Sequence, residues 1–209
     1  MAWSALRLFF GLLTLVAIGW QLTIHVRMGF NVVNFFSFFT NLSNLFAAIV
    51  LVLGARRLWR PASTGPDEGL RAISAVNMVV VGIVFSLLLR DVDLGALRPW
   101  INTLLHHVMP CVVLLDWLLQ PPRTRLGGRQ LLWTLVFPMA YLVYTLVRGS
   151  RTGWYPYPFL NPAHVGGYGG VAVYAAGIAL TFGLAGWGLV ALGDRLGRGA
   201  CRGPAPHPP

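Results

Sequence analysis

Charged residues are scarce in this chain, and lysine is absent. Only 11% of the 209 residues are charged while 56% are hydrophobic, and the mean hydropathy is +0.66. Soluble domains rarely have this composition, which is typical of a protein that crosses a membrane several times. Acidic residues number six against sixteen basic ones, all arginine, for a formal net charge of +10. The arginines lie in short gaps between apolar stretches, which favours membrane-flanking loops over a nucleic-acid-binding surface.

Cysteine is also rare. Cys111 lies inside an apolar stretch and Cys201 lies near the end of the chain, and neither belongs to a CxxC pair. This excludes a disulfide framework and favours two free thiols. His25, His106 and His107 raise a metal or haem site as an alternative, but no carboxylate or ligand spacing supports it. We therefore predict no metal and no cofactor.

Six apolar stretches predict an all-α fold, a bundle of six transmembrane helices in one domain over residues 1–194. About 20 apolar residues cross a bilayer, and the expected helices cover residues 5–26, 35–55, 71–89, 99–119, 131–147 and 171–192. A signal peptide is the alternative for the first, but its apolar run continues past the weak cleavage pattern Ala17-Ile18-Gly19. The Arg-, Gly- and Pro-rich residues 195–209 predict a disordered tail.

The distribution of arginine predicts the orientation. With six spans, eleven arginines fall on the side of the two termini and five on the other. Arginine-rich loops stay in the cytoplasm, so both termini and the tail are predicted to be cytoplasmic. The expected location is a bacterial cytoplasmic (plasma) membrane.

The most informative stretch runs over residues 35–46, where polar residues open an apolar helix. The helical spacing i, i+3, i+4, i+7 places four of them on one face: Ser37, Thr40, Asn41 and Asn44. Because the second and fourth predicted helices both enter from outside, Thr40 would lie roughly 8 Å deep and His106 roughly 10 Å deep. Polar groups at membrane depth usually face the bundle interior. We therefore expect a polar cavity in the outer leaflet, walled by the first, second, fourth and fifth predicted helices.

A threonine hydroxyl beside a histidine base fits nucleophilic catalysis, in which the histidine takes the hydroxyl proton. Asn102, one turn before His106, is placed to orient the imidazole. Amide donors such as Asn41 or Asn44 could hold an oxyanion, and a cavity open to lipid would receive an acyl ester. The candidate supporting or substrate-binding residues are Asn41, Asn44, Asn102, His107, His25, Tyr144 and Arg148.

These residues also have structural interpretations. A threonine such as Thr40 more often bonds its own helix backbone, and asparagines more often join neighbouring helices. His106 and His107 point about 100° apart, so only one can face a site squarely. Arg148 could snorkel to the interface or bind a lipid carboxylate or phosphate.

Three other patterns predict packing. Ala175, Ala179 and Gly183 repeat every four residues, which predicts close helix contact. Asp116, near the cytoplasmic end of the fourth predicted helix, is expected to pair with Arg123 or another loop arginine. The Tyr- and Pro-rich residues 154–160 predict a cap at the membrane interface.

Three motifs in register resemble the androgen-induced and androgen-dependent family of six-helix membrane proteins and its bacterial relatives. They are the Phe-Thr40 element, the Trp100-Ile101-Asn102-x-x-x-His106 element followed by Pro110, and Gly153-Trp154-Tyr155-Pro156-Tyr157-Pro158-Phe159-Leu160. The resemblance implies an intramembrane threonine hydrolase of fatty acid esters of hydroxy fatty acids, with Thr40 as nucleophile and His106 as its partner. The spacing from His106 to Pro110 is one residue shorter than in the animal members, so His107 stays an alternative.

The sequence thus predicts an integral membrane hydrolase of lipid esters, with Thr40 and His106 catalytic and with membrane lipids and a lipid ester as its partners. The alternative is a non-enzymatic membrane protein that binds or moves a lipid or a small polar ligand through the same cavity.

Overall fold

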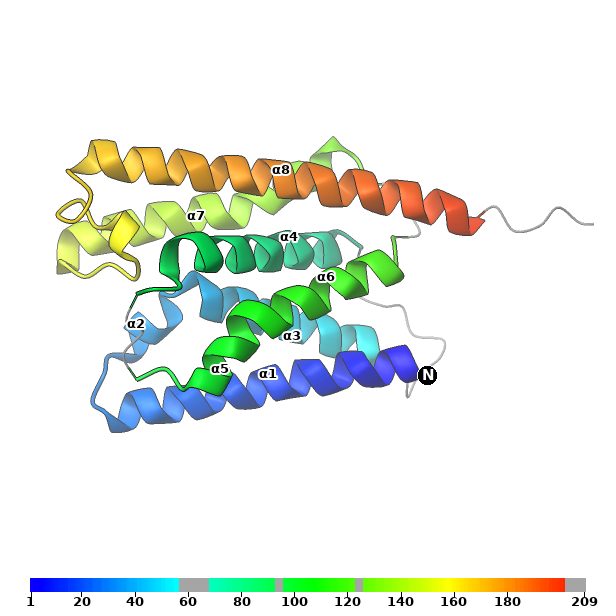
Figure 1. The fold of residues 1–209 in the computed structure, drawn as a ribbon, viewed down its shortest axis with the longest axis horizontal. Coiled ribbons are helices and arrows are strands. Elements are labelled where there is room, and N and C mark those ends of the chain that lie inside the picture. Colours follow the sequence, from blue (N-terminus) through cyan, green and yellow to red (C-terminus); the bar gives the residue numbers. More distant parts are fainter. Residues whose placement is uncertain (57–67, 93–95, 123–125, 202–209) are drawn as a thin grey trace, which may run out of the picture.

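The computed structural model describes residues 1–56, 68–92, 96–122 and 126–201, and the regular elements of that part are all helical (Figure 1). Their bounds are α1 (Ala2–Arg27), α2 (Val32–Phe36), α3 (Phe39–Ala55), α4 (Glu68–Val84), the π-helix η2 (Phe85–Leu89), α5 (Pro99–Thr103), the π-helix η3 (Leu104–Val108), α6 (Met109–Leu119), α7 (Gly128–Thr152), the 3₁₀-helix η4 (Pro158–Leu160) and α8 (Tyr168–Cys201). The all-α prediction is confirmed.

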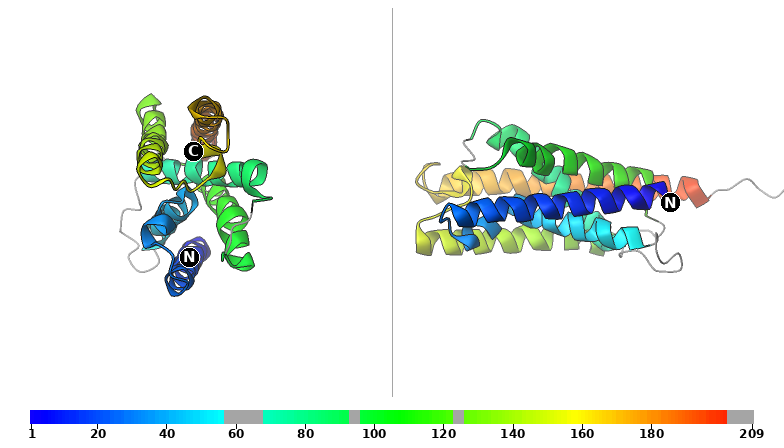
Figure 2. Two further views of the ribbon diagram at one scale, coloured as in Figure 1. Left: turned by 90° about the vertical axis from the view of Figure 1, so that its left-hand side faces the viewer. Right: turned by 90° about the horizontal axis from the view of Figure 1, so that it is seen from below.

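The long helices run side by side along one axis, with α4 in the middle of the bundle (Figures 1 and 2). It contacts α3, α6, α7 and α8, while α1 packs along α3. The N-terminus and the end of α8 lie at the same end of the bundle (Figure 1). An even number of crossings would produce this arrangement.

Within the described residues, five helices are long and apolar enough to cross a membrane: α1, Glu68–Leu89, Pro99–Leu119, α7 and Tyr168–Gly197. The apolar α3 has 17 residues and is shorter than these five. Large apolar side chains such as Leu87, Val173 and Trp187 lie 66–74% exposed on the outside of the bundle. An outer surface of this kind suits hydrocarbon rather than water. The protein is therefore an integral membrane protein.

The predicted helix over residues 35–55 is broken at Ser37 and Phe38. Asn31 caps α2 because its side-chain oxygen accepts from the Val33 N–H, and the extended backbone of Phe38 then starts α3. Ser37 therefore lies between two helices, and the four polar residues of this stretch do not share one helix. The predicted tail also differs, because α8 continues to Cys201, while residues 202–209 lie outside the described residues.

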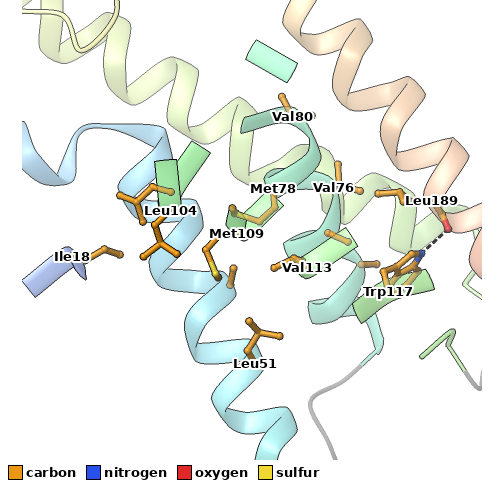
Figure 3. Packing of buried hydrophobic residues seen from close by; sticks show 14 of the residues in the cluster. Ile18, Leu51, Val76, Met78, Val80, Leu104, Met109, Val113, Trp117 and Leu189 are labelled. Atoms are coloured by element: carbon orange, nitrogen blue, oxygen red, sulfur yellow. Dashed lines mark hydrogen bonds between the residues drawn. The ribbon is translucent and has the colours of Figure 1, made fainter. Parts of the chain in front are cut away.

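The apolar core is built from residues of α1, α3, α4, η3, α6 and α8 (Figure 3). Met78, Met109 and Trp117 are almost completely buried there. The indole N–H of Trp117 donates to the carbonyl of Leu189 over 3.0 Å, which satisfies its polar atom and joins α6 to α8.

Close helix contacts fall at other small residues than those predicted. A Cβ added to Gly183 would meet nothing within 4 Å, so the prediction there is wrong. A Cβ on Gly186 would lie 2.9 Å from Leu131, and one on Gly193 would lie 2.9 Å from Trp117. Gly186 and Gly193 are seven residues apart, about two helical turns, so they share a face of α8 that lies toward α7 and α6.

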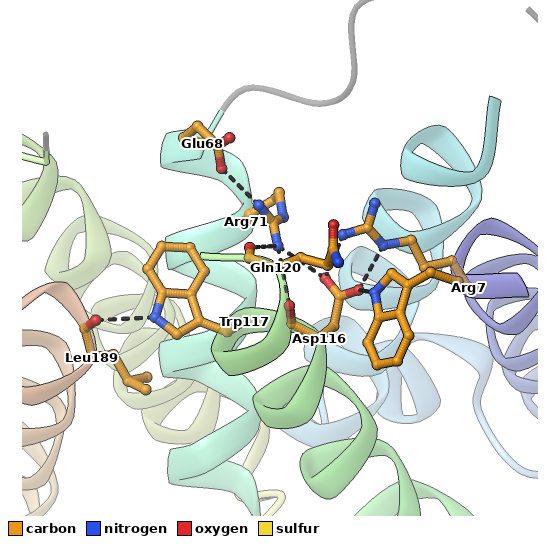
Figure 4. Close-up of polar contacts among 8 residues, drawn as sticks. Arg7, Glu68, Arg71, Asp116, Trp117, Gln120 and Leu189 are labelled. Carbon is orange, nitrogen blue, oxygen red and sulfur yellow. Dashed lines mark hydrogen bonds and ion pairs between the residues drawn. The ribbon is translucent and has the colours of Figure 1, made fainter. Parts of the chain in front are cut away.

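A buried ion cluster joins three helices at the end of the bundle that holds the N-terminus (Figure 4). Asp116 of α6 accepts from Arg7 of α1 at 2.6 Å and from Arg71 of α4 at 3.2 Å, and also from the Trp3 indole at 2.9 Å. Arg71 also forms an ion pair with the Glu68 carboxylate at 2.8 Å. The partners of Asp116 thus come from helices, while Arg123 lies outside the described residues.

Candidate functional site

Thr40 is the second residue of α3 and lies at the edge of an apolar cavity of about 90 Å³. Its side chain is buried, with 8% of the residue exposed. The other lining residues come mostly from α4, η2, α7, η4 and α8: Phe39, Val80, Val81, Val84, Phe85, Leu89, Leu135, Pro138, Met139, Tyr141, Leu142, Tyr157, Phe159, Leu160, Ala175, Ile178, Ala179 and Phe182. The three hydroxyls of Thr40, Tyr141 and Tyr157 are the polar groups of this wall.

The break before α3 is held by side chains of α7. The Tyr141 hydroxyl donates to the Ser37 carbonyl over 2.8 Å, and the Tyr144 and Ser37 hydroxyls are 2.8 Å apart. One turn further on, Arg148 donates to the Asn34 side chain over 2.6 Å and lies over the Trp154 ring. These contacts set the position of the first turn of α3, which carries Thr40.

Tyr157 reaches Thr40 from the loop after α7. Its hydroxyl lies 3.5 Å from the Thr40 hydroxyl and accepts from the Thr40 backbone N–H over 3.3 Å. The ring is buried, stacked on Phe159 and packed edge-on against Phe38. Burial raises the pKa of Tyr157, so its phenol keeps its proton at neutral pH.

Asn44 links the start of α3 to the helix that carries His106. Its amide nitrogen donates to the Thr40 carbonyl over 2.9 Å and to the Leu105 carbonyl over 3.1 Å. The Leu105 carbonyl has lost its helical donor, because the Met109 N–H bonds Leu104 in the π-turn and Pro110 has no N–H. Asn44 therefore satisfies a carbonyl that the π-helix η3 leaves free.

His106 is buried in η3, with 6% of the residue exposed. Its Nδ1 lies 3.1 Å from the backbone carbonyl of Asn102. A carbonyl only accepts, so Nδ1 carries a proton, and when the ring is neutral its lone pair is on Nε2. The prediction placed the Asn102 side chain in this orienting role, whereas the backbone of Asn102 fills it.

Phe85, the first residue of η2, contacts His106 and is also part of the cavity wall. Its ring stacks on the His106 imidazole at 4.0 Å, and Phe85 also lines the cavity. Among the described residues no hydrogen bond joins Thr40 to His106, and the lining includes no residue of α1, α5, η3 or α6. The cavity thus lies on the α4–α7–α8 side of Thr40, not between the first, second, fourth and fifth predicted helices.

The remaining predicted site residues are placed as follows. Asn41 donates to the Phe35 carbonyl over 2.8 Å, so its amide spans the α2–α3 break. His25 lies 2.9 Å from the Asn31 carbonyl, at the turn after α1. His107 is exposed, with its ring edge-on to Phe85. Tyr144 and Arg148 are near Ser37 and Asn34, beside the site but outside the cavity lining.

Sequence reasoning missed Tyr157 and Phe85 as site residues. Tyr157 was expected in an interfacial cap, and only its Tyr-Pro-Tyr-Pro setting marked the loop as unusual. Phe85 is one of many apolar residues in its helix and carries no sequence signal. Within the part of the chain that the structure describes, no group of three His, Cys, Asp or Glu side chains could hold a metal ion.

A family model described as FAR-17a/AIG1-like protein matches residues 77–191, more than half of the chain. The chain belongs to the FAR-17a/AIG1-like family. This confirms the resemblance seen in the sequence. The matched residues of this FAR-17a/AIG1-like protein include His106 and the Gly153–Leu160 motif, whereas Thr40 precedes them. No curated protein and no solved structure matches the chain.

Proposed function

We propose that this FAR-17a/AIG1-like protein is an integral membrane hydrolase of lipid (fatty acid) esters, with Thr40 as nucleophile and His106 as base. The observation that carries the proposal is the position of Thr40, a buried hydroxyl at the polar edge of an apolar cavity. The apolar lining suits the end of an acyl chain, whose ester group would then lie at the hydroxyls of Thr40 and Tyr157.

In the proposed reaction, Thr40 Oγ1 attacks the ester carbonyl carbon while His106 Nε2 takes the Thr40 proton. The tetrahedral intermediate then collapses, and His106 returns the proton to the departing alcohol. Water hydrolyses the resulting acyl-Thr40 with His106 again as base, which releases the fatty acid and restores the hydroxyl. The tautomer set by the Asn102 carbonyl leaves Nε2 free for this role.

Two features support the pairing of Thr40 with His106. The Asn44 amide donates to the carbonyls of both Thr40 and Leu105. It therefore links the proposed nucleophile to the residue directly before His106. π-Helices recur at functional sites, and both His106 and its stacking partner Phe85 lie in one. Catalytic hydrogen bonds often tighten only when substrate binds, so their absence without ligand is compatible with the role.

The test uses full-length purified protein in lipid nanodiscs with a fluorogenic long-chain acyl ester. Thr40→Ala and His106→Gln should each lower kcat by about 10²–10⁴-fold, and Thr40→Ser should restore part of it. Matched controls are Thr103→Ala, an exposed threonine on the same helical span as His106, and His107→Gln. Equal activity in the wild type, Thr40→Ala and His106→Gln excludes the proposal. Loss with His107→Gln rather than His106→Gln reassigns the base.

A second candidate is a membrane protein that binds or moves a lipid chain without chemistry. The predominantly apolar lining, which does not include His106, favours it. This candidate predicts that a fluorescent fatty acid binds the wild type and Thr40→Ala equally. It also predicts that no fluorophosphonate probe labels Thr40. A labelled Thr40 peptide would exclude binding alone as the function.

A further inference from the structure

The Tyr157 hydroxyl lies beside both the side chain and the backbone of Thr40, in a loop far from α3 in sequence. The two hydroxyl oxygens are 3.5 Å apart, and the Thr40 N–H donates to the Tyr157 oxygen over 3.3 Å. That N–H belongs to the first turn of α3 and has no acceptor within the helix. The Tyr157 oxygen therefore accepts from this N–H, and among the described residues its own hydrogen faces the Thr40 hydroxyl rather than a backbone carbonyl.

We propose that Tyr157 is a third catalytic residue, which donates its hydroxyl hydrogen bond to the oxyanion that forms when Thr40 attacks an ester carbonyl. The inference rests on the proposed function and adds a residue that neither the family match nor the sequence analysis assigns to the reaction. The oxygen that becomes negative is two bonds from Thr40 Oγ1, within reach of a hydroxyl 3.5 Å from that atom. No proton is transferred, because Tyr157 only shares its hydrogen.

Burial makes this donor effective. Tyr157 is 8% exposed, and its ring is fixed by the parallel stack on Phe159 at 5.1 Å and by the edge contact with Phe38. A donor held in place and shielded from water stabilises a developing charge without having to reorganise. The hydrogen bond from the Thr40 N–H, at the positive end of α3, further polarises the phenol.

Tyr141 is the other tyrosine of the cavity wall, but its proton is already donated. It donates to the Ser37 carbonyl over 2.8 Å, so it holds the break before α3. Asn41 and Asn44, the oxyanion donors that the sequence suggested, give amide hydrogens to the carbonyls of Phe35, Thr40 and Leu105. Of the two tyrosine hydroxyls in the described cavity wall, that of Tyr157 is thus the one whose hydrogen is not held by a backbone carbonyl.

The experiment compares Tyr157→Phe with the exposed control Tyr168→Phe in the full-length protein. Removing one oxyanion donor should lower kcat for the acyl ester about 10²–10³-fold. KM and the affinity for a non-hydrolysable ether analogue should stay unchanged, because the ring and its stack remain. Tyr168→Phe should match the wild type. A Tyr157→Phe variant with wild-type kcat overturns the inference, and so does one in which kcat and ether binding fall together.

A second substitution separates hydrogen bonding from folding. Incorporation of 3-fluorotyrosine at position 157 keeps the hydroxyl and ring but makes the phenol a stronger donor, which should raise kcat without changing KM. An unchanged kcat overturns the inference.

The outcomes also distinguish this inference from the hydrolase proposal. If Thr40→Ala is inactive while Tyr157→Phe is fully active, the hydrolase proposal stands and only this inference fails. If Thr40→Ala keeps wild-type activity, or the wild type has none, both the hydrolase proposal and this inference fail.

Discussion

The Phe85 ring stacks on the His106 imidazole with centroids 4.0 Å apart and planes 22° from parallel. Each residue lies in a π-helix, Phe85 at the start of η2 and His106 in the middle of η3. Because Phe85 also lines the cavity beside Thr40, it connects the buried histidine to this apolar cavity. The two π-turns thus lie against each other next to the candidate nucleophile.

We predict that Phe85 shields His106 from solvent reagents. Diethylpyrocarbonate should modify the exposed His107 before the buried His106. Replacing Phe85 by Ala removes the stacked ring, so His106 should then react at a rate closer to that of His107. Mass spectrometry of the labelled peptides measures both rates. Trp100→Ala, at an exposed aromatic near the start of α5, serves as control. Equal labelling of His106 in the wild type and in Phe85→Ala would contradict the shielding role.

The Asn44 amide should stabilise the π-helix that Pro110 helps to create. Asn44→Ala leaves the buried Leu105 carbonyl without a donor, which should cost roughly 1–3 kcal/mol in thermal or chemical unfolding. In a Pro110→Ala background the segment can regain an α-helical turn, in which the Met109 N–H would bond the Leu105 carbonyl. The cost of Asn44→Ala should therefore shrink there. Strict additivity of the two substitutions would count against this coupling.

The ion cluster around Asp116 should be a major source of stability. Asp116→Asn removes the charge that Arg7 and Arg71 share, and breaking a buried pair in this way should cost about 3–5 kcal/mol. Unfolding in mixed micelles measures the effect. The control is Asp91→Asn, since the Asp91 carboxylate is 88% exposed and its loss should leave stability unchanged. Equal stability of the two variants would show that the cluster contributes little.

Two glycines should respond in opposite ways to the same substitution. A Cβ at Gly149 would overlap the Tyr155 ring, so Gly149→Ala should cost about 1–3 kcal/mol and displace the loop that carries Tyr157. Ester hydrolysis should fall with it. Gly183 has open space, and Gly183→Ala should instead gain about 0.5–1 kcal/mol, because alanine favours the helix. Melting temperatures and activities of both variants test this contrast.

The arginine distribution predicts that both termini are cytoplasmic. A fluorescent-protein fusion at the C-terminus should therefore be bright in bacterial cells, and an alkaline phosphatase fusion at the same position should be inactive. Reporters placed between α1 and α2 should give the opposite result. An active phosphatase at the C-terminus would reverse the orientation and place Thr40 in the inner leaflet.

Local sequence was sufficient for the helices. Apolar run length and the stops at Arg and Pro predict the helical span Pro99–Leu119 with the bounds that the structure has. It was not sufficient for the break at Ser37, because every residue there tolerates a helix. Asn31 caps α2 just before this break, and the Tyr141 hydroxyl of α7 donates to the Ser37 carbonyl at the break. That donor comes from more than 100 residues away, so no local pattern contains it.

The same distinction applies to the site. By itself the sequence determined that this is an all-helical membrane protein with a polar start to α3, because hydropathy and residue spacing are local properties. Only the tertiary structure decided which groups meet Thr40. Tyr157 reaches it from the loop after α7, and Asn44 of the same helix joins it to the Leu105 carbonyl of η3. His106 meets Phe85 where the two π-turns lie against each other. Contacts between distant segments depend on how the bundle packs, which residue spacing along one helix does not specify.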